Sequence, residues 1–153
     1  MRNAELNVSG YSSVSTVTSC STWLTSEICS HGMCAAYLLF FAFCRVFGHS
    51  GDDAKKIIYS NWLNMVRAGL LGLEFYSPDT NSWRQAHMQA RYVILRVLLE
   101  ADGVVSISER TGTDGEPDLL ISLNEENIYT NGRKAIADFL LKLQVLLVIE
   151  MWR

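Results

Sequence analysis

The sequence has no excess of positive charge. Its 153 residues include 13 Lys and Arg against 16 Asp and Glu, which gives a formal net charge of -3. Proteins that bind nucleic acid attract phosphates through clustered basic side chains, and this chain contains no short basic tract. We therefore expect no nucleic-acid partner.

The sequence also lacks a CxxC pair and a secretory signal. Cys20, Cys29, Cys34 and Cys44 all lie in the first third of the chain, without the spacing of a zinc ribbon or a redox dithiol. One early arginine and a polar stretch stand where a secretory signal would have an apolar segment and a cleavage site. These features predict reduced thiols and a cytoplasmic location.

An apolar run of membrane length is missing as well. Residues 33–44 are apolar throughout, but Arg45 ends the run after roughly a dozen residues, against the roughly 20 that a membrane span needs. We expect a buried helix here, with Gly48 as its stop, and no membrane partner. A membrane-associated anchor is the less supported alternative.

The composition suits one domain with a modest core. Hydrophobic residues make up 49% of the chain and charged residues 19%, which places it outside the disordered class. Ser and Thr dominate residues 9–26 and bury little apolar surface. We predict a disordered Ser/Thr-rich tail over residues 1–26 and one helical unit over residues 27–153.

Apolar periodicity predicts helices with identifiable starts. Ser50 and Asp53 form an acidic variant of a capping box before a helix that ends near Phe75. Ser82 and Gln85 form a second capping box before a helix that continues to about residue 101, and the two helices should pack together. A further amphipathic helix is expected over about residues 132–149.

A β-hairpin interrupts the helical pattern. β-favouring runs at residues 104–108 and 119–123 flank a turn at residues 111–117. The predicted fold class is therefore mainly α, with one β-hairpin at about residues 104–123.

The second predicted helix carries the most informative polar residues. Arg84, His87 and Arg91 stand at i, i+3 and i+7 and should share one face, with Gln85 nearby. Two guanidiniums and an imidazole can hold a carboxylate or stabilise an oxyanion. Spacing alone nevertheless favours a solvated basic face.

Other polar residues favour structural roles. Asn61, Asn64 and Arg67 form a stripe on the preceding helix, which predicts a hydrogen-bonded network between the two helices. His31 and His49 are isolated, and a lone histidine is more often a structural group than a metal ligand. No HExxH helix, Gly-rich phosphate loop or GxSxG elbow is present.

Two long strings resemble a known family. YSNWLNMVRAGLL at residues 59–71 and NSWRQAHMQAR at residues 81–91 are similar to the M49 metallopeptidases, the dipeptidyl peptidase III family. The resemblance covers about residues 48–146. It implies a cytoplasmic zinc exopeptidase that releases dipeptides from the N-termini of oligopeptides.

The resemblance also assigns roles to residues. It implies that His87 is catalytic and hydrogen-bonds the developing oxyanion, and that Gln85, Arg91 and Arg96 bind the peptide substrate. Under this interpretation the basic face is an active-site wall rather than a solvated surface.

Departures from the family pattern are equally specific. The family holds zinc with an HExxGH helix, which is missing here, and with a glutamate of an EECRAE-like motif. Glu27 falls at that glutamate's place if no gap is allowed, whereas Ile28 replaces it if Cys29 is aligned with the motif cysteine. Catalytic zinc needs three protein ligands, so one carboxylate predicts an incomplete site that does not bind zinc in this chain alone.

Two interpretations follow. One is a truncated helical fragment of a zinc-peptidase lobe, inactive alone, with part of the wall that binds oligopeptides. The alternative is a non-catalytic interaction module, whose exposed apolar helix faces would favour self-association.

Overall fold

The computed structural model describes residues 34–35, 37–112 and 115–151. The predicted tail at residues 1–26 and Glu27 lie outside this range. Within it the chain is mainly α-helical with two small antiparallel strand pairs, so the predicted fold class is confirmed. No helix among the described residues has both the length and the apolar character to cross a membrane.

The predicted stop at Gly48 is confirmed. Residues 37–46 are helical, and Gly48 adopts a φ of 79°, which ends the helix. The Gly48 amide donates to the Arg45 carbonyl at 3.3 Å, and the His49 amide donates to the Cys44 carbonyl at 2.8 Å. This pair of bonds is a Schellman motif, which satisfies the last carbonyls of the helix.

Helix α2 spans Gly51–Leu71 and continues as the 3-10 helix η3, Gly72–Phe75, so the predicted end near Phe75 is confirmed. Its buried side is repeated with helical spacing at Ile58, Trp62, Val66 and Gly69. The capping box was wrong in detail, because Ser50 is the N-cap residue but its side chain makes no capping hydrogen bond.

The second capping box was wrong as well. Helix α3 spans Ala86–Glu100 and its N-cap residue is Gln85, not Ser82. Ser82 lies instead in strand β2, Ser82–Trp83, which pairs with strand β1, Tyr76–Ser77. The Trp83 ring contacts the rings of Tyr76 and Tyr92, at 5.2 and 5.5 Å between centroids. These aromatic contacts hold the segment extended before the helix begins.

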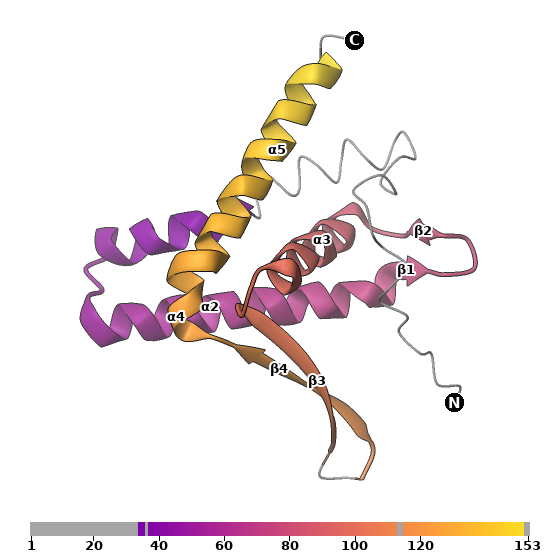
Figure 1. Cartoon of the computed structure of the whole chain (residues 1–153), viewed down its shortest axis with the longest axis horizontal. Coiled ribbons are helices and arrows are strands. Elements are labelled where there is room, and N and C mark those ends of the chain that lie inside the picture. Colours follow the sequence, from indigo (N-terminus) through magenta and orange to yellow (C-terminus); the bar gives the residue numbers. More distant parts are fainter. Residues whose placement is uncertain (1–33, 36, 113–114, 152–153) are drawn as a thin grey trace.

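The predicted hairpin is confirmed, and its two strands are longer than the predicted runs at residues 104–108 and 119–123. Strands β3, Val105–Thr111, and β4, Pro117–Leu123, pair antiparallel with Val105 opposite Leu123. Figure 1 shows the hairpin projecting away from the helices. The strands are followed by a short helix α4, Glu125–Asn127, a π-helical turn η4, Ile128–Gly132, and helix α5, Arg133–Met151.

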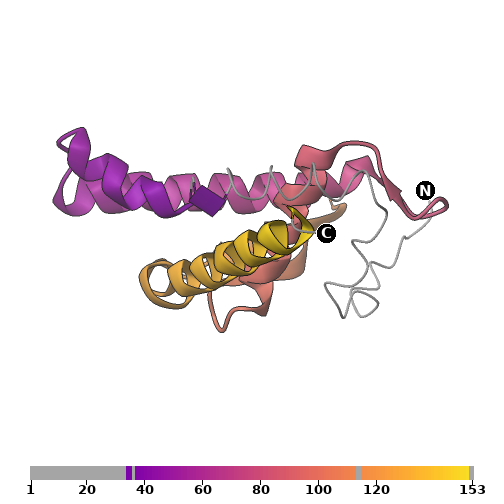
Figure 2. The same cartoon turned by 90° about the horizontal axis from the view of Figure 1, so that it is seen from above.

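The helices meet around Trp62. Its side chain is fully buried, with the Tyr37 ring edge-on at 4.8 Å and the Phe41 ring at 6.1 Å. A Cβ atom at Gly132 would lie 2.9 Å from the indole, so the turn before α5 packs directly on it. Seen from above, α5 lies in a different layer from α2 and the helix at residues 37–46 (Figure 2). The core therefore joins the two layers.

Candidate functional site

The start of helix α3 carries three of the predicted site residues. Gln85 is the exposed N-cap residue, His87 lies exposed in the first turn, and Arg91 is half-buried one turn further on. His87 and Arg91 are four residues apart, so they occupy the same side of the helix. This part of the predicted row is present.

Arg84 does not belong to the row, which corrects the predicted i, i+3, i+7 pattern. The residue precedes α3, and its amide donates to the Phe75 carbonyl at 2.8 Å. Its guanidinium donates to the Glu74 carbonyl and lies over the Phe75 ring, 5.7 Å from the centroid. Arg84 therefore binds the end of η3, because the helix begins two residues after it.

Arg91 reaches a cavity of about 360 Å³. The cavity lies where the helix at residues 37–46, α2 and α3 meet, and its lining consists of Tyr37, Asn64, Met65, Ala68, Arg91 and Ile94. Tyr37 is buried, and its burial, followed by a smaller electrostatic contribution from Cys34, raises the pKa of its hydroxyl. The phenol therefore stays protonated at neutral pH and can act as a donor.

The charge of Arg91 is not neutralised within the described part of the chain. Its Nη1 atom lies 3.6 Å from the Met88 sulfur, a weak acceptor, and no ion pair to a described carboxylate is formed. A half-buried guanidinium that lines a cavity without a carboxylate partner is suited to binding an anion or a carbonyl oxygen.

Arg96 faces elsewhere. It follows Arg91 by five residues, which turns its side chain by about 140° around the helix axis. Its Nη2 atom donates to Glu100 Oε1 at 3.0 Å, and this bond, followed by a smaller contribution from Tyr92, raises the pKa of the guanidinium. The structure brings Arg91 and His87 together but not Arg96, whose role in substrate binding stays a prediction.

The predicted polar network on α2 is wrong. Asn61 Nδ2 donates to the Met65 sulfur at 3.4 Å, while Asn64 and Arg67 are exposed. Asn64 lines the cavity beside Arg91, and Arg67 lines a different one. The sequence analysis therefore did not identify Asn64 or Tyr37 as candidate site residues. For Tyr37, a polar hydroxyl within an otherwise apolar run was a signal that could have indicated such a role.

The described residues do not fit a zinc site. No group of three His, Cys, Asp or Glu side chains that could hold a metal occurs among them. Glu27 and His31 lie outside the described residues, and His49 and His87 are both exposed. Glu27 as a zinc ligand stays a prediction.

Comparisons with known proteins identify close relatives. The model of peptidase family M49 matches residues 9–149, a wider range than the residues that carry the resemblance above. Dipeptidyl peptidase 3 of Nematostella vectensis is 61% identical over 102 residues, which cover 66% of this chain and 14% of that relative. The human protein of the same name is 59% identical over 103 residues, covering 67% of this chain and 14% of that relative.

A more distant relative matches a similar stretch. Dipeptidyl peptidase 3 of Dictyostelium discoideum is 43% identical over 96 residues, covering 60% of this chain and 13% of that protein. The matched part of the chain thus spans only about a seventh of the length of these curated relatives.

Proposed function

Because this chain belongs to peptidase family M49, we propose that it supplies the peptide-binding wall of a dipeptidyl peptidase. The observation that carries the proposal is Arg91, whose guanidinium lines the cavity between three helices with no carboxylate partner among the described residues. The curated relatives that match this stretch bear the name dipeptidyl peptidase 3, which points to N-terminal dipeptides of oligopeptides as the substrate class.

The residues of the wall have different proposed roles in binding the peptide. Arg91 binds a carbonyl or carboxylate oxygen of the peptide, assisted by Asn64 and the Tyr37 hydroxyl from the same cavity. His87, one turn away and exposed, donates a hydrogen bond to the carbonyl oxygen at which negative charge develops. Gln85, at the N-cap of α3, is a further contact with the peptide. Arg96 faces another side of α3 and would contact the substrate only outside this wall.

We also propose that this chain does not hydrolyse peptides alone. An HExxGH string is absent from its sequence, and Glu27 is the single candidate ligand for zinc.

Cys34 and Cys44 are buried free thiols, which favours a reducing compartment, and we propose that the protein is cytoplasmic.

Binding of an oligopeptide to the full 153-residue chain tests the wall. Isothermal titration calorimetry with a peptide that has a free N-terminus should show measurable binding. Arg91→Met should weaken the affinity for this peptide about tenfold or more. Arg45→Met is the matched control, because Arg45 is an exposed arginine on the helix at residues 37–46 and lines neither cavity. Equal affinities for the two variants would contradict the proposed role of Arg91.

Metal analysis after dialysis, paired with release of a fluorescent dipeptide amide, tests the inactivity. We expect neither bound zinc nor release. One zinc per chain together with release would show that the chain assembles a complete site, and Glu27→Gln would then identify whether that residue is a ligand.

A second function is favoured by the exposed apolar side chains. Leu39 and Val46 on the helix at residues 37–46, Phe47 directly after it, and Leu141 on α5 are each more than half exposed. An interaction module derived from the peptidase would cover such faces by self-association. Sedimentation velocity over a range of concentrations would then show a dimer, and a monomer at every concentration would remove this candidate.

A further inference from the structure

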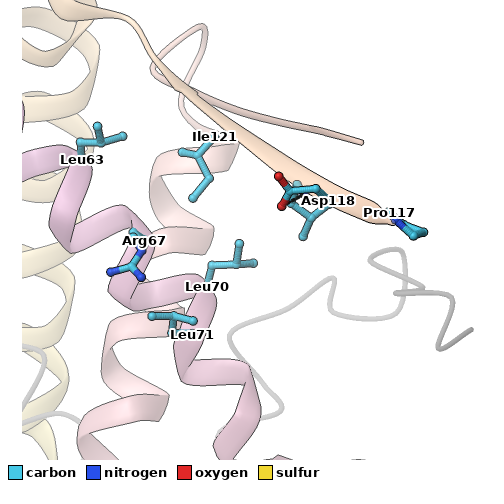
Figure 3. Close-up of a pocket in the computed structure, with 8 residues that line it drawn as sticks. Leu63, Arg67, Leu70, Leu71, Pro117, Asp118 and Ile121 are labelled. Carbon is cyan, nitrogen blue, oxygen red and sulfur yellow. Dashed lines mark hydrogen bonds between the residues drawn. The ribbon is translucent and has the colours of Figure 1, made fainter. Parts of the chain in front are cut away.

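A second cavity, of about 570 Å³, lies between helix α2 and strand β4. Figure 3 shows the lining residues on the helix and on the strand at either side of it. Its lining consists of Leu63, Arg67, Leu70 and Leu71 from α2, and Pro117, Asp118, Leu119 and Ile121 from β4. None of these residues lies on α3, so this α2–β4 groove is separate from the peptide-binding wall.

The apolar walls of the groove are left partly uncovered. Leu71 on the helix is 44% exposed, and Leu119 on the strand is 39% exposed. Strand β4 pairs with β3 and with no other strand in the described part of the chain. Covering such leucines would remove apolar area from water, so the groove favours an apolar occupant.

The two charged residues of the groove differ in how far they are neutralised. Asp118 Oδ2 accepts from Arg110 Nε at 3.2 Å and Nη2 at 3.1 Å, while its Oδ1 accepts from the Leu119 amide at 2.8 Å. Arg67 forms no ion pair with any carboxylate that the structure describes. The groove therefore presents an uncompensated positive charge between leucines.

We propose that the α2–β4 groove docks an apolar peptide segment that carries one carboxylate, from a part of an M49 polypeptide outside the stretch that this chain matches. The carboxylate pairs with Arg67, and the apolar neighbours of the carboxylate cover Leu70, Leu71 and Leu119. The matched stretch is 14% of the length of the human relative, so such a polypeptide has many further segments. The proposal rests on family membership and not on peptidase activity.

Overlapping short synthetic peptides that tile the human relative outside its matched stretch are the probes. Their binding to the full 153-residue chain is measured by fluorescence anisotropy. We expect a peptide with one Asp or Glu among apolar residues to bind, and Arg67→Glu to weaken its binding about tenfold or more. Lys56→Glu makes the same charge change at an exposed position of α2 outside the groove and should leave binding unchanged.

A charge exchange makes the test specific. The same peptide with Lys in place of its acid should bind Arg67→Glu better than it binds the unaltered chain. Leu119→Asp, on the opposite wall of the groove, should also weaken peptide binding. This second variant keeps the proposal testable if Arg67→Glu does not fold. Arg91→Met should have no effect, which separates this groove from the peptide-binding wall.

Three outcomes would overturn the proposal. One is that none of the tiled peptides binds, and another is that binding is indifferent to both Arg67→Glu and Leu119→Asp. The third is a concentration-dependent dimer that Arg67→Glu dissociates, because the occupant would then be a second copy of this chain.

Discussion

Gly69 of helix α2 lies directly against Leu95 of helix α3. A Cβ atom at position 69 would stand 2.7 Å from the Leu95 Cβ atom and 2.9 Å from the Arg91 carbonyl oxygen. Gly72 is similarly close to the Met88 carbonyl, at 2.8 Å. The absence of side chains at these two positions lets α2 and η3 approach α3 closely.

Gly69→Ala should therefore destabilise the protein despite the higher helix propensity of alanine. The new methyl group meets backbone as well as side chain, so α3 must shift, at a cost of about 1–3 kcal/mol in the free energy of unfolding. Urea denaturation measures this cost. Ser60→Ala, at an exposed position of the same helix, is the control and should change stability by less than about 0.5 kcal/mol. Similar stabilities for both variants would mean that the helices are not closely packed.

Glycine has a different task at position 48. Its φ of 79° is costly for residues with a side chain, although no atom lies within 4 Å of an added Cβ. Gly48→Ala should lower the free energy of unfolding by about 1 kcal/mol through backbone strain alone. Gly48→Asn is the matched variant, because asparagine tolerates this conformation, and it should cost less. Thermal unfolding of the two variants compares them, and an equal loss would argue against strain as the cause.

Sequence periodicity predicted the helices well and their first residues poorly. The repeat of Ile58, Trp62 and Val66 indicates burial directly, because one side of α2 faces the core from Ile58 to Gly69. A capping signal is local and can be overridden by tertiary contacts. Ser82 illustrates this, since packing of Trp83 between Tyr76 and Tyr92 favours a strand at the position where the sequence predicted a cap.

The candidate site was predictable only where its residues share one helix. His87 and Arg91 follow from spacing of four along α3, whereas Tyr37 and Asn64 join Arg91 through the packing of three helices. No sequence pattern within a single helix can predict that residues of three helices line the same cavity. Arg84 was wrongly included in the row, because the sequence predicted a helix that begins before this residue. The contacts of the Trp83 ring keep this segment extended, and α3 begins only at Ala86.

His87→Ala should leave stability within about 0.5 kcal/mol of the unaltered chain, since the imidazole is exposed in the first turn of α3 and supports no core contact. Urea denaturation checks the expectation. Ile94→Ala, two turns further along and almost fully buried, should cost about 2–5 kcal/mol and shows that the assay responds to α3. A loss above about 2 kcal/mol for His87→Ala would assign this residue a structural role instead of the proposed contact with substrate.

Stability should fall at alkaline pH, beginning with Cys34. Burial raises the pKa of this thiol from 9.0 to about 12, and the hydroxyl of its neighbour Tyr37 also has a raised pKa because of burial. Between pH 9 and 12 the unfolded chain loses the Cys34 proton while the folded chain retains it. The folded state is therefore destabilised as pH rises, by up to about 1.4 kcal/mol per pH unit for each such group.

Urea unfolding at neutral pH and at several values between 9 and 12 measures this slope. Cys34→Ala removes the thiol and should show a shallower decline than the unaltered chain, even though its stability at neutral pH is lower because a buried side chain has been shortened. Tyr37→Phe should flatten the decline only above pH 10, where an ordinary tyrosine begins to ionise. If both variants kept the slope of the unaltered chain, the alkaline loss would come from other groups, and the burial of Cys34 and Tyr37 beside the smaller cavity would not be controlling it.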